Sequence, residues 1–309
     1  MTEPEDRVGN EASETVAVAG ATGNAGREIV RALVERGHRV RALVRNPDRL
    51  GALRDRCAEV RVVQVTERGS LRGALDGADR VVSALGKTWQ KDAVPRRLVD
   101  VEANLNLMHE AKRSGTKRFG LLSVAWASMD HPATMVRMKA EVEDALRHSG
   151  LPFVIIQPSG FFSDLWEVLE MCKKGTFWAI GDGRLRFNPI SLVDLGDFVA
   201  EALFNDERKG QSLPIGGPQT FDSFDLASLC GRVLGREVKV RNVPLWLAKA
   251  GVAAVRPFSR DLFEMGEFFV GNTVFGVQRD NDGTVPAYGT HQLEAYYRDR
   301  LAKGTTPSH

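Results

Sequence analysis

The feature that most constrains this chain is a glycine-rich turn between a short apolar run, 15–19, and an amphipathic helical pattern, 26–36. In this setting the first glycine permits a tight turn, the second lets the backbone approach a pyrophosphate, and the third lets the helix pack closely. Unpaired N–H groups at the helix start favour phosphate. The sequence therefore predicts a dinucleotide-binding turn formed by Gly20, Ala21, Thr22, Gly23, Asn24, Ala25 and Gly26.

The rest of the first half alternates short apolar segments with helical patterns. Strands are predicted at 15–19, 38–45, 60–65, 80–85, 118–124 and 153–157, and helices at 26–36, 47–57, 70–75, 98–114 and 134–149. Such alternation predicts βαβ units, and strands with little polar alternation indicate a sheet covered on both faces. Because crossovers are right-handed, we expect an α/β fold with a Rossmann-type doubly wound parallel sheet and a smaller C-terminal substrate/cap region.

The second half is less regular. Strands are predicted at 185–190, 213–218 and 237–243, and helices at 191–204, with Asp194 as a candidate cap, 224–234 and 246–255. The expected organisation is a disordered lead-in (1–14), an NAD(P)-binding domain (15–160), a substrate/cap region whose strands return to the sheet (161–303), and a tail (304–309). Most aromatic residues of this half are expected in the core: Phe161, Phe162, Trp166, Phe177, Trp178, Trp246, Phe263, Phe268 and Phe269.

Composition narrows the function classes. The formal net charge is +2, with 42 basic and 40 acidic residues, and no basic stripe indicates nucleic-acid binding. No run reaches the roughly 18 apolar residues of a membrane span. The acidic start is unlike a signal peptide, so a cytoplasmic location is expected. The three cysteines lie far apart with no ligand spacing, so no metal site is predicted. No feature indicates an oligomeric state.

The residue after the second predicted strand indicates which cofactor is bound. An NAD site usually has Asp or Glu there, whereas this chain has Arg45, whose guanidinium suits a 2′-phosphate. Arg41 or Arg49 could assist, and Asp48 comes one step too late to replace the acid. The sequence therefore predicts NADP(H), with NAD(H) as the less favoured cofactor.

Residues 16–26 resemble the phosphate-binding turn of extended and atypical short-chain dehydrogenase/reductases, which commonly reads GATGxxG. The resemblance implies an adenine contact from Gln64 and Val65, where the family usually has Asp followed by Leu or Val. It also implies that the small residues Ala84, Leu85 and Gly86 lie under the adenine ribose.

Typical members of that family use Ser, Tyr and Lys, with Tyr four residues before Lys. The resemblance implies that Ser123 and Lys139 are the catalytic candidates and also contact the cofactor. Met135 occupies the tyrosine position, and a thioether cannot donate a proton. Tyr288, Tyr296 and Tyr297 all lie near the C-terminus. Lys139 could clamp the ribose or donate the proton itself; Asp130 or His131 could supply a proton, and Asn104 or Asn106 could order a water.

Three further segments, 101–119, 139–150 and 151–164, resemble the NmrA-like atypical members of that family. The match extends to 188–190 and 216–218. The family's turn after the sixth strand implies cofactor contacts from Pro158, Gly160 and Phe161, with Gln157 in place of the usual Arg. The group contains reductases, redox-sensing regulators without turnover, a respiratory complex I subunit and photosystem assembly factors, so membership predicts the fold better than the reaction.

Two functions follow as hypotheses. The first is an NADP(H)-dependent oxidoreductase that reduces a small apolar carbonyl compound or conjugated alkene; an alkene could take its proton from water without the tyrosine. The second is a non-catalytic NADP(H)-binding redox sensor or assembly factor, whose segments 166–178 and 257–277 would face a protein partner. An epimerase or dehydratase with tightly held NAD is weaker, because it needs the same tyrosine.

Overall fold

The computed structural model describes residues 13–87, 94–279 and 282–304. Among these residues, seven strands form one parallel sheet with the order β3-β2-β1-β4-β5-β6-β9. The strands are β1 (Thr15–Ala19), β2 (Arg39–Val44), β3 (Glu59–Val62), β4 (Arg80–Ser83), β5 (Arg118–Leu122), β6 (Phe153–Pro158) and β9 (Ser212–Ile215). The predicted Rossmann-type α/β fold is confirmed, because the strand order reverses next to β1 as in dinucleotide-binding sheets.

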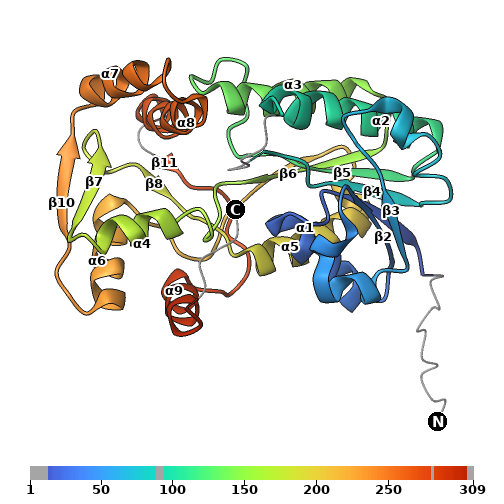
Figure 1. Cartoon of the computed structure of the whole chain (residues 1–309), viewed down its shortest axis with the longest axis horizontal. Helices are drawn as coiled ribbons and strands as arrows, with labels where there is room; N and C mark the ends of the chain where they lie inside the picture. Colours follow the sequence, from blue (N-terminus) through green and yellow to red (C-terminus); the bar gives the residue numbers. More distant parts are fainter. Residues whose placement is uncertain (1–12, 88–93, 280–281, 305–309) are drawn as a thin grey trace, which may run out of the picture.

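Helices cover both faces of this sheet (Figure 1). One face is covered by α1 (Asn24–Glu35) and α5 (Leu192–Phe204), and the other by α2 (Ala103–Arg113) and α3 (Thr134–His148). Each face has its own apolar core: the first includes Val16, Ile29 and Leu203, and the second includes Leu107 and Leu146. The carboxyl ends of β1, β4, β5 and β6 meet at one edge of the sheet, where the predicted site residues follow.

Two predicted helices of the first half are short 3₁₀ segments instead. Pro47–Arg56 is 3₁₀-helical and is interrupted at Gly51, whose φ of 56° and ψ of −136° lie outside the helical range. Arg68–Leu71 is a 3₁₀ turn in place of the helix predicted at 70–75. The helix predicted at 98–114 begins with a π-helical turn, Leu98–Glu102, and then continues as α2. The Asn46 side chain caps the first of these segments by accepting from the Asp48 N–H at 2.9 Å.

The C-terminal region packs around a third core that includes Phe162, Trp166 and Phe177. Its elements are α4 (Trp166–Cys172), β7 (Thr176–Ile180), β8 (Arg186–Phe187), α6 (Ser223–Leu234), β10 (Lys239–Val243), α7 (Leu245–Val255), α8 (Arg260–Val277), β11 (Asp282–Gly283) and α9 (Leu293–Ala302). The expectation that the aromatic residues are core is only partly right, since Trp178, Trp246 and Phe269 are exposed. Cys172 and Cys230 are buried in this core as free thiols.

Segments of the second half also complete the first domain. The strand β9 pairs with β6, and α5 contributes Leu195, Phe198 and Leu203 to the core beneath β1. Ser191, not Asp194, caps α5 by accepting from the Val193 N–H at 3.2 Å. The buried Asp194 carboxylate instead accepts from the backbone N–H of His291 at 3.1 Å, so it fixes the loop before α9.

The chain ends fall mostly outside the described residues. Residues 1–12 of the predicted lead-in and 305–309 of the predicted tail are not described. Of the last two lead-in residues, the Ser13 hydroxyl donates to the Gly37 carbonyl at 2.8 Å, and Glu14 forms ion pairs with Arg80 and Lys117.

Candidate dinucleotide site

The glycine turn has the geometry that a phosphate-binding loop requires. Gly20 has a φ of +80°, and a Cβ there would lie 2.7 Å from the Ala84 carbonyl oxygen. A Cβ on Gly26 would lie 2.1 Å from the Gly20 carbonyl oxygen. Only glycine fits at either position: a side chain on Gly20 would strike the backbone that follows β4, and one on Gly26 would push α1 away from the turn after β1. Gly23 precedes α1 and offers no side-chain cap, so the first turn keeps N–H groups for a ligand.

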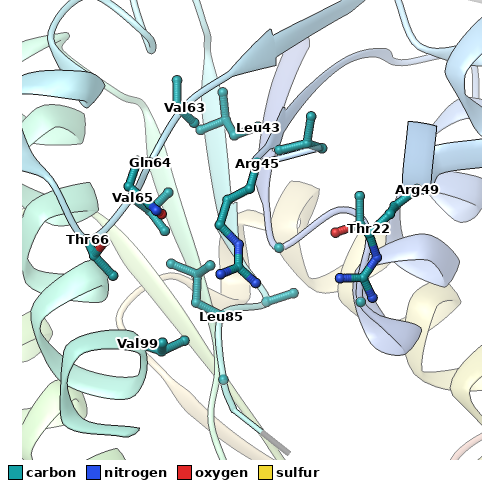
Figure 2. Close-up of a pocket in the computed structure, with 15 residues that line it drawn as sticks. Thr22, Leu43, Arg45, Arg49, Val63, Gln64, Val65, Thr66, Leu85 and Val99 are labelled. Carbon is teal, nitrogen blue, oxygen red and sulfur yellow. The ribbon is translucent and has the colours of Figure 1, made fainter. Parts of the chain in front are cut away.

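A pocket opens directly above this turn, at the carboxyl edge of the sheet. Figure 2 shows its labelled residues, with Arg45 between Thr22 and Arg49 on one side and Gln64 and Val65 on the other. Nine of the predicted cofactor residues line it: Gly20, Thr22, Gly23, Arg45, Gln64, Val65, Ala84, Leu85 and Gly86. The glycine cradle and this lining fit a dinucleotide, with the pyrophosphate on the turn.

Charge around the pocket favours a phosphorylated ribose. Arg45 and Arg49 both line it, and none of the described lining residues is Asp or Glu. Arg41 does not assist: it is buried, its Nε lies 2.5 Å from a Glu59 carboxylate oxygen, and its Nη1 donates to the Asp76 carbonyl at 2.8 Å. Asp48 is an exposed partner of Arg54 and does not line the pocket, so it does not replace the acid of an NAD site.

A side chain of α2 supports the backbone of Val65 and Thr66, which line the pocket. The Asn106 side-chain amide donates to the carbonyls of Val65 at 3.2 Å and Thr66 at 3.3 Å. Gln64 donates its backbone N–H to the Ser70 hydroxyl at 2.8 Å. Asn106 therefore fixes the backbone that lines the pocket, and its role in ordering a water stays a prediction.

Lys139 lies beside the small residues at the end of β4 and is not a surface lysine. Its ammonium donates to the Leu85 carbonyl at 2.9 Å and lies 3.5 Å from the Leu122 carbonyl. A Cβ on Gly86 would lie 3.3 Å from Lys139 Nζ and 3.6 Å from a carboxylate oxygen of Asp100. Burial lowers the pKa of Lys139, and the Asp100 carboxylate opposes that effect. The lysine thus joins β4, β5 and α3 next to the pocket.

A buried polar network supports this lysine from α2. The Asn104 amide donates to the Asp100 carbonyl at 2.9 Å, and the Ser83 hydroxyl donates to the Asn104 side-chain oxygen at 2.5 Å. Asp100 accepts the Lys87 N–H at 2.7 Å and pairs with Arg96 at 3.4 Å. Asn104 is fully buried and bonded to these groups, and its role in ordering a water stays a prediction.

Ser123 follows β5 as predicted and is 6% exposed. Its hydroxyl oxygen is buried and has no hydrogen-bond partner among the described residues, and Ser123 does not line the pocket. Tyr297 is buried in the third core and donates to the Leu165 carbonyl at 2.5 Å, while Tyr288 donates to Glu201 at 3.2 Å. Met135 remains the residue in the family's tyrosine position, on the first turn of α3.

The two other proton-donor candidates precede α3. His131 is 1% exposed, packs on Phe275 and accepts the Ala133 N–H on Nδ1 at 3.1 Å. Burial, with the positive charge of Arg137, lowers the pKa of His131 to about 4. Its ring is therefore neutral near pH 7, with the proton on Nε2. Asp130 is exposed on the loop.

The remaining predicted contacts lie on the same edge but do not line this pocket. The Pro158 carbonyl accepts the Ala125 N–H at 2.8 Å, and the Gly160 carbonyl accepts the Ile190 N–H at 2.8 Å. Phe161 packs against the first core together with Ala25. Ala21 is fully buried, so it offers its backbone but not its side chain. These positions, with Asn24 and Gly26, remain predictions of cofactor contact.

Sequence reasoning missed several pocket residues: Leu43, Val44, Val63, Thr66 and Val99. Val63 and Val99 are apolar and come from segments without a motif, so spacing could not single them out. Asp100, whose charge acts on Lys139, was missed for the same reason: it belongs to no recognisable motif, and it lies near the lysine because the π-helical turn Leu98–Glu102 packs against α3.

A family model described as NAD(P)H-binding matches residues 20–206. This chain belongs to that NAD(P)H-binding family. The predicted resemblance to atypical short-chain dehydrogenase/reductases is thereby confirmed, and the chain carries the fold of an NAD(P)H-binding reductase family.

Two kinds of relative are similar over most of the chain. The chloroplastic divinyl chlorophyllide a 8-vinyl-reductase of Oryza sativa subsp. indica is 29% identical over 323 residues, covering 94% of this chain and 79% of the relative. Photosystem II assembly factor Ycf39 of Guillardia theta is 28% identical over 232 residues, covering 74% of this chain and 73% of the relative.

Solved reductase structures share the fold. An Escherichia coli NADPH-dependent quinone oxidoreductase complexed with NADPH has a TM-score of 0.73 at 18% identity, covering 93% of this chain and 99% of that one. The leucoanthocyanidin reductase–NADPH complex from Vitis vinifera has the same TM-score at 19% identity, with the same coverage. Within the described part of this chain, no helix is long and apolar enough to cross a membrane.

Proposed function

We propose that this protein reduces a conjugated carbon–carbon double bond of an apolar substrate, with NADPH as the reductant. The observation that carries the proposal is Lys139, a lysine held beside the cofactor pocket in a chain that lacks the family's tyrosine. The similarity to vinyl reductases over 94% of the chain supports the choice of double bond.

Residues of the pocket have separate roles in this proposal. The turn from Gly20 to Gly26 would hold the pyrophosphate, and Arg45 with Arg49 would hold the 2′-phosphate. Gln64 and Val65 would contact the adenine. Ala84, Leu85 and Gly86, which line the pocket after β4, would lie beneath the adenine ribose.

NADPH, when bound, supplies the hydride. Saturation of a double bond also requires one proton, and the chain must supply it or admit water. Reduction of a carbonyl would place charge on one oxygen and require an acid at that atom, whereas a conjugated system spreads the charge over several atoms. The hydride adds to one carbon of the double bond, and the Lys139 ammonium can donate the proton to the other carbon. Burial lowers the pKa of Lys139, which makes release of this proton easier. The proton is then restored from solvent.

Cofactor choice is tested first, by fluorescence titration with NADPH and NADH. We expect NADPH to bind more tightly. The double variant Arg45→Ala/Arg49→Ala should weaken NADPH binding by about 10- to 100-fold, since two charge-assisted hydrogen bonds are lost. NADH affinity should change little, because NADH has no 2′-phosphate. Equal losses for both cofactors would contradict the assignment of these arginines.

Turnover is tested by following NADPH oxidation with enones, vinyl-substituted tetrapyrroles, quinones and aldehydes. We expect consumption with the conjugated alkenes. Lys139→Ala should lower kcat by about 10²- to 10⁴-fold, the usual contribution of a general acid. Lys139→Arg keeps the charge but cannot release a proton at neutral pH. If Lys139→Arg retains the wild-type kcat, Lys139 holds the cofactor and does not donate the proton. The control is Lys174→Ala, which changes an exposed lysine and should leave kcat unchanged.

A second candidate function is an assembly factor or redox sensor that binds NADP(H) without turnover. Its support is the similarity to photosystem II assembly factor Ycf39 over 74% of the chain, together with the exposed aromatic residues of the C-terminal region. Tight NADPH binding with no oxidation by any compound of the panel would favour this candidate over the reductase.

A further inference from the structure

Lys249 is the one charged residue of α7, whose other residues are apolar or glycine, yet none of its residues is buried. A helix that is hydrophobic all round normally lies in the interior. Here one stripe, formed by Leu245, Ala248, Val252 and Val255, is half-buried. Figure 1 shows α7 at the outer edge of the C-terminal region, beside α8.

Contact with α8 accounts for only that inner stripe. Gly266 of α8 makes room for Val252, since a Cβ on Gly266 would lie 2.6 Å from a Val252 methyl carbon. On the outer side, Trp246 is 71% exposed and Leu247 is 47% exposed. The apolar surface continues into the turn after α7, where Phe258 is 89% exposed.

Positive charge is concentrated along the same stretch. Residues 238–260 contain no Asp or Glu but five basic residues: Lys239, Arg241, Lys249, Arg256 and Arg260. This contrasts with the whole chain, whose formal net charge is +2. Arg260 pairs with Glu264 at 2.8 Å. Among residues 13–87, 94–260, 262–279 and 282–304, no carboxylate forms an ion pair with the other four, so these carboxylates leave their charge available to an anionic partner.

We propose that α7 and the turn 256–260 dock this protein on an anionic lipid bilayer, without spanning it. Trp246, Leu247 and Phe258 would enter the interfacial layer, and Lys249 and Arg256 would face the headgroup phosphates. Exposed Trp, Phe and Leu beside Lys and Arg are typical of helices that lie in a membrane interface. A two-fold contact between copies would place these unpaired positive charges against each other, which argues against a second chain as the occupant. The proposal does not depend on cofactor choice or turnover.

The test is flotation of the full chain with vesicles, in the absence of cofactor. We expect the protein to float with vesicles of phosphatidylcholine and phosphatidylglycerol and to remain in the bottom fraction with phosphatidylcholine alone. Binding should fall when the salt is raised from about 0.1 M to about 1 M, because the Debye length falls from about 10 to about 3 Å.

Two variants separate charge from apolar contact. Lys249→Glu/Arg256→Glu should lower the affinity for the anionic vesicles by about tenfold or more, since each basic residue near the surface contributes to attraction. Trp246→Ala/Phe258→Ala should leave a weaker, fully salt-sensitive association. The matched control is Arg72→Glu/Lys209→Glu, which reverses two exposed charges elsewhere and should bind like the wild type. Thermal melting confirms that each variant is folded.

Three results would overturn the proposal. One is no flotation with anionic vesicles; another is flotation that the control variant reduces as much as Lys249→Glu/Arg256→Glu. The third is a concentration-dependent dimer in sedimentation that requires Trp246 and Phe258 and forms without any vesicle binding, which would make this face a contact between copies.

Discussion

His131 is the residue whose charge state the fold controls most clearly. Burial lowers its pKa to about 4 from the ordinary value of 6.5. Between these values the unfolded chain binds a proton that the folded chain does not, so stability is complete above pH 6.5 and falls as the pH drops toward 4. We expect the free energy of unfolding to decrease by about 1–2 kcal/mol between pH 7 and pH 5 from this group alone.

The variant His131→Asn isolates that effect. Its amide oxygen can still accept the Ala133 N–H but does not titrate. Urea unfolding of both proteins at pH 7 and pH 5 should show the smaller pH dependence in the variant. Identical pH dependence in the two proteins would mean that the His131 ring binds its proton at pH 5 in the folded protein as it does in the unfolded chain.

At the scale of single residues, the sequence predicted groups whose chemistry follows from their position in a motif. The glycines of the turn, Arg45 after β2 and Lys139 on α3 all lie where the pattern placed them. The sequence could not indicate the hydrogen-bond partners of Asn104 and Asn106, because an asparagine on a helix has no partner until the fold supplies one. Asn104 bonds to the Asp100 carbonyl one turn earlier in its own helix and to the Ser83 hydroxyl, and Asn106 bonds to backbone carbonyls that follow β3.

Among the elements, α3 depends on α8 for its first turn. Ala133 offers no side-chain cap, and Glu267 of α8 fills that role by accepting the Thr134 N–H at 2.9 Å and its hydroxyl at 3.1 Å. Gly271 lets α8 come this close, since a Cβ there would lie 3.0 Å from the Ala133 nitrogen. Because a carboxylate at a helix N-terminus is stabilising, Glu267→Ala should lower the free energy of unfolding by about 1–2 kcal/mol.

Glu267→Gln is the matched variant, since it keeps one acceptor oxygen and loses the charge. Guanidinium unfolding should give it the smaller loss. A change below about 0.5 kcal/mol in Glu267→Ala, the range of ordinary surface substitutions, would show that α3 begins without this cap.

Periodicity predicted the strands of the first half because buried parallel strands are short and apolar, as 80–83 and 118–122 are. It failed at 47–57, where Gly51 adopts a φ of 56° and breaks the helix. Periodicity did not predict the helix at 260–277. Because this helix packs against both α3 and α7, its apolar residues are not confined to one face, and the helical pattern is weak. The cap from Glu267 was likewise invisible, because its partner is 133 residues away.

For the whole molecule, the structure joins the two halves more closely than a boundary at residue 160 suggests. The segments α5 and β9 come from the second half but belong to the first sheet and its core. Arg96 pairs with Glu264 of α8 at 2.6 Å, and Ser159 donates to the Asn188 carbonyl at 2.6 Å, so polar contacts also link the regions. Local patterns cannot predict such links, since none of them repeats along the chain.

These connections predict that the chain unfolds in one transition, and two buried leucines test this. Leu203 of α5 fills the first core beneath β5, where a Cβ on Gly120 would lie 3.2 Å from its methyl carbon. Leu169 fills the third core, and both leucines are 0% exposed. Either change to alanine should cost about 2–5 kcal/mol. If the halves unfold together, far-UV and near-UV circular dichroism should report the same lowered midpoint in both variants. A different result would contradict this prediction: Leu169→Ala could give an early near-UV transition and leave the far-UV midpoint of the remaining structure unchanged. The C-terminal region would then unfold by itself, and the contacts of Arg96 and Ser159 would not couple it to the sheet.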